Sequence, residues 1–513
     1  MTTQPPTPEE LLCILHLYAG FNRSAYEASV SELRRISPEP KDNAWKRERQ
    51  IADAIAAVVT RREKEVSAVT WTASSRNITI HVAQNGAVDS GVVDHLKLIW
   101  TKLQAISRYG PQTSEEALRK TPDEVLDEDL MDLWRQTFDY IYTTCFPKLR
   151  ARIAKRRREA QEFITTMNDA IASDARLPDS DTPLSDITIL RRLLACVQQI
   201  YELIDLPASE ATPKIVDVLA EERRDWARAT RENGLLMINW QAIFEQRQQE
   251  RTMASNAKTF DFRRFMEKAY SLHTHIQTLC RAATSSRRKV MFHAELDVVL
   301  VQPYAALSRP FSFSEEDIGS FIESLCEDGS KTPHEEEEES KPEEQETCPF
   351  ISRERLLAQL GQSYSKTSQV VDLSRQIPHC ECTLLVYHTT TSTDLPPHPY
   401  IGVSQLSCYP CYLFFEAYRQ AVPKGVLWEL KGTHGKIYPG WVRPKGLSQE
   451  ANEKVEQLMV KKLTERLRLS LAEAKKARTL SDSTDASGSS GASLRTAHRN
   501  PAWSSILNEL SQG

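Results

Sequence analysis

The chain of 513 residues has room for two or three domains, and its 40% hydrophobic content is enough to bury substantial cores. Its net charge of −5 arises from 65 basic and 70 acidic residues. This near balance excludes bulk electrostatic attraction to nucleic acid or to an anionic membrane as the basis of function, although a local basic cluster can still bind phosphate.

The ten cysteines are not spaced as a disulfide framework, because they are scattered singly over the first 350 residues and gather only near residues 380–411. An apolar run at residues 11–18 follows Glu9 and Glu10 instead of a basic region, and no small-residue cleavage site follows it. We therefore expect an intracellular protein, cytoplasmic or nuclear, without a membrane span.

Residues 1–285 carry mostly helical patterns, and we expect a mainly helical region there whose role the sequence does not assign. Thr7-Pro8-Glu9-Glu10 contains a capping residue, a proline at the first helical position and a capping-box glutamate. Apolar residues recur at spacings of three and four over residues 92–106 and 262–279, which is typical of packed helices. Residues 77–82 alternate apolar and polar before Asn85-Gly86, which predicts a small hairpin.

Residues 148–158 carry seven positive charges in a helical context. Such a cluster can contact phosphates or act as a nuclear import signal. Leu149 and Ile153 lie four residues apart, so the alternative is an ordinary solvated helix face with one apolar edge.

Two segments are too polar to fold alone. Residues 327–346 contain ten carboxylates and no apolar side chain, which predicts an acidic disordered insertion at about residues 325–347. Residues 479–513 begin with a stretch rich in Ser, Thr, Gly and Ala and are predicted to form a disordered tail. Before this tail, apolar residues at every fourth position predict an amphipathic helix over residues 448–478.

The residues that can carry chemistry gather between Pro378 and Pro444. His379-Cys380-Glu381-Cys382 precedes a polar loop, a predicted strand at residues 400–406, and Cys408-Tyr409-Pro410-Cys411. One histidine and two cysteines suit a zinc ion that keeps a fourth position open for water. A glutamate two residues after the histidine can move protons between that water and a leaving amine. His379, Cys408 and Cys411 are therefore the predicted metal ligands, and Glu381 is the predicted catalytic residue.

Both halves of this motif fit the start of a helix. Cysteines three residues apart in a first turn share a face, and their thiolates gain from the positive end of the helix dipole. Residues two apart on a helix point about 200° apart. His379 and Glu381 therefore converge only if the histidine occupies the non-helical entry, as Pro378 before it favours.

These motifs resemble the cytidine deaminase-like superfamily, and more closely a fungal-expanded branch of nucleic acid or nucleotide deaminases. The resemblance also includes Tyr400-Ile401-Gly402-Val403-Ser404 and Thr433-His434-Gly435-Lys436. It implies an α/β deaminase-like domain at residues 286–447, with a mixed five-stranded sheet flanked by helices. It also implies zinc as the cofactor, a nucleotide or single-stranded nucleic acid as the substrate, and a place near the pocket for His434. Tyr400 is a candidate for stacking on the base, although packing against the sheet is the alternative.

The chain departs from the superfamily pattern in two ways. Its proline is Pro410, inside the cysteine pair, whereas the superfamily usually has a proline directly before the first cysteine. The strand pair expected upstream of the histidine has one good candidate at residues 290–301 and a weaker one at residues 370–371.

Three alternatives stay open at this point. His293-Ala294-Glu295 is a second His-x-Glu that could supply the ligand and the carboxylate. Cys380 and Cys382 could join the later cysteines in a closed four-sulfur zinc site without an open position. The domain could also be a non-catalytic, zinc-stabilised interaction module that retains the deaminase fold.

Overall fold

The computed structural model describes residues 6–19, 43–74, 76–109, 128–173, 184–231, 240–242, 244–245, 260–327, 353–391, 395–423 and 425–482. Most of the predicted acidic insertion and of the predicted disordered tail therefore lies outside the described residues. The helix predicted at residues 448–478 is present as α17 (Gln449–Asp482).

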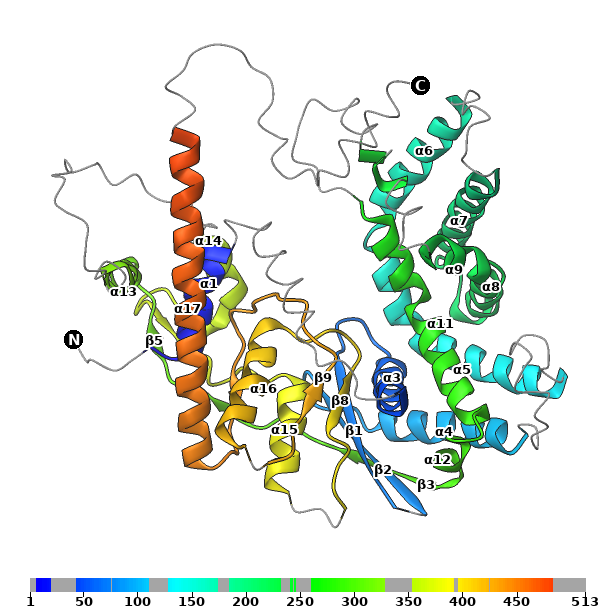
Figure 1. The fold of residues 1–513 in the computed structure, drawn as a ribbon, viewed down its shortest axis with the longest axis horizontal. Coiled ribbons are helices and arrows are strands. Elements are labelled where there is room, and N and C mark those ends of the chain that lie inside the picture. Colours follow the sequence, from blue (N-terminus) through cyan, green and yellow to red (C-terminus); the bar gives the residue numbers. More distant parts are fainter. Residues whose placement is uncertain are drawn as a thin grey trace.

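A mixed five-stranded sheet, as the family resemblance predicts, lies at the centre of the molecule in the order β3-β2-β1-β8-β9 (Figure 1). The antiparallel pairs are β1–β2 and β1–β8, and the parallel pairs are β2–β3 and β8–β9. The five strands are β1 (Ser67–Ala73), β2 (Asn77–Gln84), β3 (Glu295–Leu300), β8 (Tyr400–Val403) and β9 (Glu429–Leu430).

The strands of this sheet come from both sides of the domain boundary expected near residue 285. The hairpin of β1 and β2 is not a local insert among helices, because β1 pairs with β8 through Ala68↔Val403 and Val69↔Gly402. The weaker strand candidate, β7 (Val370–Val371), lies in a separate sheet with β5 (Phe311–Ser312) and β6 (Tyr364–Ser365). Alternation along a strand reveals its buried face but not its distant partner, which explains both differences.

Helices cover both faces of the sheet (Figure 1). On one face, α3 (Asn43–Val58) packs against β1 and β8, and α4 (Gly91–Tyr109) packs against β3. On the other face lie α15 (Cys380–Thr390) and α16 (Tyr409–Ala421). Successive strand residues point to opposite faces, so Tyr400 belongs to the first core and Ile401 to the second.

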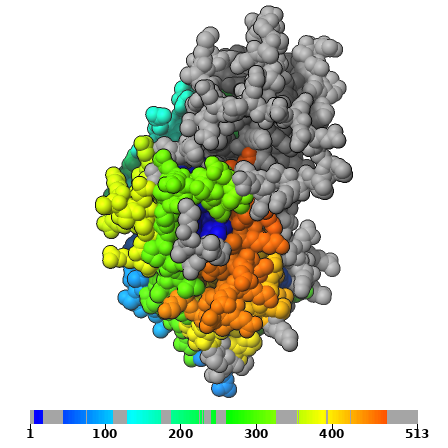
Figure 2. All heavy atoms as spheres, turned by 90° about the vertical axis from the view of Figure 1, so that its left-hand side faces the viewer, coloured from blue at the N-terminus to red at the C-terminus, as the bar shows by residue number. Residues whose placement is uncertain are grey.

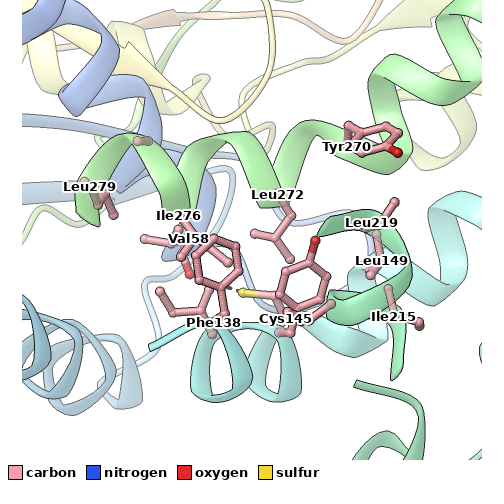
Figure 3. Packing of buried hydrophobic residues seen from close by; sticks show 14 of the residues in the cluster. Val58, Phe138, Cys145, Leu149, Ile215, Leu219, Tyr270, Leu272, Ile276 and Leu279 are labelled. Carbon is pink, nitrogen blue, oxygen red and sulfur yellow. Dashed lines mark hydrogen bonds between the residues drawn. The ribbon is translucent and has the colours of Figure 1, made fainter. Parts of the chain in front are cut away.

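The first core extends from α3 into the helical region through α11 (Phe262–Thr284). Figure 3 shows Leu272 and Ile276 of α11 beside Phe138 and Cys145 of α5 (Glu128–Ala154). Leu149 and Ile153 are buried in this core, as the helix-edge interpretation of the basic segment predicts. The remaining helices of this part are α6 (Arg157–Ser173), α7 (Leu184–Leu203), α8 (Ala208–Glu221), α9 (Arg223–Arg231) and α12 (Lys289–His293).

The second core lies under α17, which packs against α1 (Pro8–Ala19) and α16. In Figure 2, part of the blue α1 is visible between the orange α17 and green residues. The predicted capping box begins α1, because Glu10 N donates to Thr7 Oγ1 at 3.2 Å and Thr7 N donates to Glu10 Oε2 at 3.4 Å. The smaller elements nearby are β4 (Ala306–Leu307), α13 (Glu315–Glu327), α14 (Arg353–Leu360), η2 (Gly361–Ser363) and β10 (Arg443–Pro444).

None of the helices in the described ranges combines the length and the apolar character needed to cross a bilayer.

Helix α3 touches the backbone of β8 at Gly402. A Cβ atom added there would lie 2.4 Å from the carbonyl carbon of Ala52 and 2.5 Å from its oxygen. Beside this contact, Asp53 Oδ1 accepts hydrogen bonds from Val403 N at 3.1 Å and from the Tyr400 hydroxyl at 3.0 Å. Only glycine fits at residue 402 without separating the helix from the strand.

We predict that Gly402→Ala lowers the free energy of unfolding by about 3 kcal/mol, because the added methyl group meets rigid backbone. Urea unfolding followed by circular dichroism measures this change. Gly319→Ala in α13 is the matched control, since its Cβ would have no neighbour within 4 Å and alanine is favoured in helices. Equal stability of the two variants would contradict the close packing of α3 on β8.

Candidate metal centre

The two chain segments predicted to hold a metal both begin a helix. His379 is the N-cap of α15, with extended φ of −65° and ψ of 148°, so it occupies the non-helical entry that its convergence with Glu381 requires. Cys408 is the N-cap of α16, and Cys411 follows in the first turn. Pro410 lies in that same first turn, where a missing N–H costs little because the first amides of a helix have no intrahelical partner.

The side chains of His379, Cys408 and Cys411 form the group of possible metal ligands found among the described residues, with ligand atoms within 4.8 Å of one another. His379 Nδ1 lies 3.4 Å from Cys408 Sγ and 3.3 Å from Cys411 Sγ, and the two sulfurs are 3.2 Å apart. Ligands of one tetrahedral zinc lie about 3.5 to 3.8 Å apart. The observed triangle is slightly smaller, so one ion can contact all three atoms after small side-chain shifts.

The electrostatics of this group also fit a cation. Burial strongly raises the pKa of the Cys408 and Cys411 thiols, so the protein alone does not stabilise two thiolates there. Burial lowers the pKa of His379, but the neighbouring Cys408 and Glu381 outweigh it and raise the pKa to about 9. A bound divalent cation would favour both thiolates and the neutral imidazole, which are the forms that coordinate a metal.

Trp441 makes a hydrogen bond to one of the possible ligands, Cys411. Its indole Nε1 donates to Cys411 Sγ at 3.1 Å, and its ring is fully buried. An N–H donor to a ligating sulfur orients the thiolate and stabilises its negative charge. The sequence analysis missed Trp441, and its position 30 residues after Cys411 is no signal of this contact.

Glu381 lies in the first turn of α15 and is buried, with 4% of the residue's surface exposed. Its Oε2 accepts a hydrogen bond from the Cys380 thiol at 3.4 Å. Burial is the main reason that the pKa values of Cys411 and Tyr438 are raised, and the charge of Glu381 adds to both shifts. The carboxylate therefore acts on the groups of the centre at short range.

The closed four-sulfur site does not form in this structure. The Cys380 thiol faces Glu381 instead of the other sulfurs. Cys382 is buried beside Cys411 and within hydrogen-bonding reach of its sulfur, but it is not part of the group of possible ligands. Cys380 has a different structural contact, because its backbone N donates to Asn85 Oδ1 at 2.8 Å. Asn85, which directly follows β2, thus ties the sheet to the first turn of α15.

The alternative pair His293 and Glu295 is not at the centre. Both side chains are exposed, one at the end of α12 and the other at the start of the edge strand β3. Ala294 between them packs into the first core, and its carbonyl oxygen accepts a hydrogen bond from Trp100 Nε1 at 3.1 Å. Neither residue belongs to the group of possible metal ligands.

Of the two predicted substrate contacts, Tyr400 lies on the face of the sheet opposite the candidate metal centre. Its ring is fully buried in the first core against α3, where its hydroxyl binds Asp53 and the Arg49 guanidinium lies 4.9 Å from the ring centroid. Helices α15 and α16, which carry the possible metal ligands, pack on the other face. This position favours the packing alternative for Tyr400 over a contact with substrate.

His434 does lie near the centre, in a loop held to the start of α16. Its backbone N donates to Ser407 O at 3.0 Å. Between His434 and His379 stands Tyr438, whose ring centroid is 6.0 Å from the first and 5.8 Å from the second. Tyr438 is 43% exposed, so its ring, which the sequence motifs did not indicate, is an aromatic group that borders the centre and is open to solvent.

We predict that His379→Ala and Cys408→Ser each abolish stoichiometric zinc binding, because two ligands do not hold the ion firmly. The double variant Cys380→Ser/Cys382→Ser should keep about one zinc per chain, since neither sulfur is in the ligand group. Elemental analysis of the purified proteins measures both. Loss of zinc from the double variant would instead support the closed four-sulfur site.

Comparison with known proteins identifies the same segment. Residues 378–445 match a family model described as OTT_1508_deam-like deaminase. No curated protein and no solved structure matches the chain. The matched residues begin one position before His379 and include both cysteines of the centre, Glu381 and Trp441. The C-terminal region of this chain therefore contains a deaminase domain of a cytidine deaminase-like family.

Proposed function

We propose that the protein is a zinc-dependent hydrolytic deaminase that acts on a nucleobase in a nucleotide or in single-stranded nucleic acid. The observation that carries the proposal is the convergence of His379, Cys408 and Cys411 beside the buried carboxylate of Glu381. In the proposed reaction, water replaces the exocyclic amine of the base, a C=O bond takes the place of the C–NH₂ bond, and ammonia leaves.

In this proposal His379 Nδ1 and the sulfurs of Cys408 and Cys411 hold the zinc. A zinc ion with three protein ligands supplies the Lewis acidity that makes water a nucleophile near neutral pH. The helix starts at Cys408 and His379 direct positive dipole ends toward this site, which favours the thiolates and the developing negative charge on the substrate.

Glu381 moves the protons. One of its carboxylate oxygens accepts a proton from the attacking water and delivers it to the ring nitrogen beside the attacked carbon. The same carboxylate then carries the second proton to the amine, which leaves as ammonia. Burial of Glu381 supports this role, because a carboxylate shielded from bulk water exchanges protons with the bound substrate instead of with solvent.

We assign Tyr438 and His434 to the proposed binding site for the base. The partly exposed Tyr438 ring offers a face or an edge to a base in front of the centre. An intracellular setting also remains our proposal. The eight cysteines whose side chains the structure describes are free thiols, which fits a reducing compartment.

We predict that Glu381→Gln lowers kcat for ammonia release by at least about 100-fold, because the amide cannot accept and transfer the proton. Zinc content should stay at the wild-type level, since Glu381 is not in the ligand group. Glu453→Gln on the exposed side of α17 is the matched control. A coupled ammonia assay across nucleosides, nucleotides and short single strands measures the rates.

Unchanged turnover in Glu381→Gln would contradict the proposed proton transfer. A wild-type protein that holds zinc but releases no ammonia from any substrate in the panel would favour the non-catalytic interaction module.

We predict that Tyr438→Ala raises KM by about 10-fold, because loss of an aromatic contact to a base costs on the order of 1 kcal/mol or more. Tyr400→Phe should leave KM unchanged and lower the free energy of unfolding by about 1 kcal/mol, since the buried Asp53 loses one hydrogen bond. Steady-state kinetics and urea unfolding of both variants measure these effects. A raised KM in Tyr400→Phe alone would contradict the assignment.

A further inference from the structure

Basic side chains on two helices of the N-terminal region face one another. On α5, Lys148 and Arg152 are four residues apart and share a face. On α11, Arg264, Lys268 and His275 lie at spacings of four and seven and also share a face. The two faces meet where Arg152 Nη1 donates to Ser271 Oγ of α11 at 3.0 Å.

A series of hydrogen bonds links this face of α5 to the start of the metal-bearing helix α15. Lys148 Nζ donates to Glu65 O at 3.3 Å, just before β1. The next carbonyl, Val66 O, accepts from Asn85 N at 3.1 Å, and Asn85 Oδ1 accepts from Cys380 N at 2.8 Å. Lys148 therefore lies a few residues from the turn that carries Glu381.

The loop of the deaminase domain brings further positive charge to the same place. Lys436 O accepts from Tyr409 N at 3.0 Å, which fixes this loop to the first turn of α16. Burial lowers the pKa of Lys268, and the cations Arg264, Arg152, Arg156 and Lys436 lower it further. Lys436 therefore adds to the positive potential at Lys268.

The same convergence appears at His275. Its pKa is lowered to about 3, mainly by burial and then by Lys431, Arg152 and Lys148. Of the carboxylates nearby, Asp53 is buried and paired with Lys431 at 3.4 Å, and Glu65 accepts hydrogen bonds from Arg61 N and Arg62 N at 2.8 and 2.9 Å. Neighbouring basic groups repel one another and so lower one another's pKa. An anion bound among them offsets this repulsion.

We propose that Lys148, Arg152, Arg264, Lys268 and Lys436, hereafter the basic cluster, bind the phosphate backbone of a single-stranded nucleic acid whose target base enters the metal centre. This inference rests on the proposed deaminase function and adds to it a binding site built by the helical region. The basic cluster draws its cations from three separate elements: Lys148 and Arg152 from α5, Arg264 and Lys268 from α11, and Lys436 from the loop held to α16. Five cations on three elements exceed what one phosphate group needs, so the basic cluster fits a chain of phosphates better than a free nucleotide.

The basic cluster uses only part of the sequence motif at residues 148–158. Arg157 has a structural role, since it donates to Tyr201 O and to Asp205 Oδ2, both at 2.9 Å. Arg156 pairs with Glu159 at 3.0 Å. Arg152 of that motif contacts α11 at Ser271, and Lys148 contacts Glu65 O, next to the strand that leads to Asn85 and Cys380.

The test measures binding of a fluorescein-labelled single strand of 20 nucleotides with mixed sequence to the zinc-loaded full chain. We expect Arg264→Gln/Lys268→Gln to raise Kd at least 10-fold and to reduce the slope of log K against log salt by about 1.4, which corresponds to two lost phosphate contacts. Arg263→Gln is the matched control, because Arg263 is the neighbour of Arg264, points to another face of α11 and pairs with Glu267. Fluorescence anisotropy at several KCl concentrations gives both quantities.

Two results would overturn the proposal. One is a wild-type protein that deaminates free nucleotides but binds the single strand without salt dependence. The other is a double variant that loses catalysis on a mononucleotide as strongly as on the strand, which would assign the basic cluster to a single phosphate. Salt-dependent binding of the strand by a zinc-loaded wild-type protein that releases no ammonia from any substrate would contradict the proposed function and leave the basic cluster standing as a binding site.

Discussion

The antiparallel pairing of β1 with β8 is the contact on which the candidate metal centre depends. It joins Ser67 to Ser404 across 337 residues, with Ser67 N donating to Ser404 Oγ at 3.1 Å and Ser404 N donating to Ser67 O at 3.0 Å. The contact of α3 with Gly402 closes one side of this pair. Because β2 is fixed to β1, Asn85 at its end can reach Cys380 N and set the first turn of α15.

A second set of contacts holds the centre from the opposite direction. Arg443 is buried and pairs with Glu9 of α1 at 2.9 Å and with Glu456 of α17 at 2.8 Å. The two carboxylates, one buried and one half-buried, pair with the guanidinium. A buried guanidinium without such partners would destabilise the fold. Trp441 lies two residues earlier, so the same ion pairs hold the segment that delivers its indole N–H to Cys411. Helices α1 and α17 thus support the segment that carries Trp441.

The helical region contributes both to the fold around the candidate metal centre and to the proposed binding of substrate. The family match covers residues 378–445 and supplies the residues of the metal centre. The strands β1 and β2 and the helices α5 and α11 lie outside that match, yet they complete the sheet and carry most of the basic cluster. In our proposal the deaminase segment supplies the reaction, and the preceding helices supply the contacts to phosphate that the chain's net negative charge would not lead one to expect.

Local sequence determined the metal centre and the individual helices. His379, Glu381, Cys408 and Cys411 lie close together in the chain at helix starts, and the cap at Thr7 and the stripe of α17 depend on short-range periodicity. Only the tertiary structure decided which distant segments meet. The pairing of β1 with β8, the burial of Tyr400 against Asp53, and the contacts of Asn85, Trp441 and Tyr438 depend on strand partners and faces, because alternation along a strand specifies two faces but not what covers each.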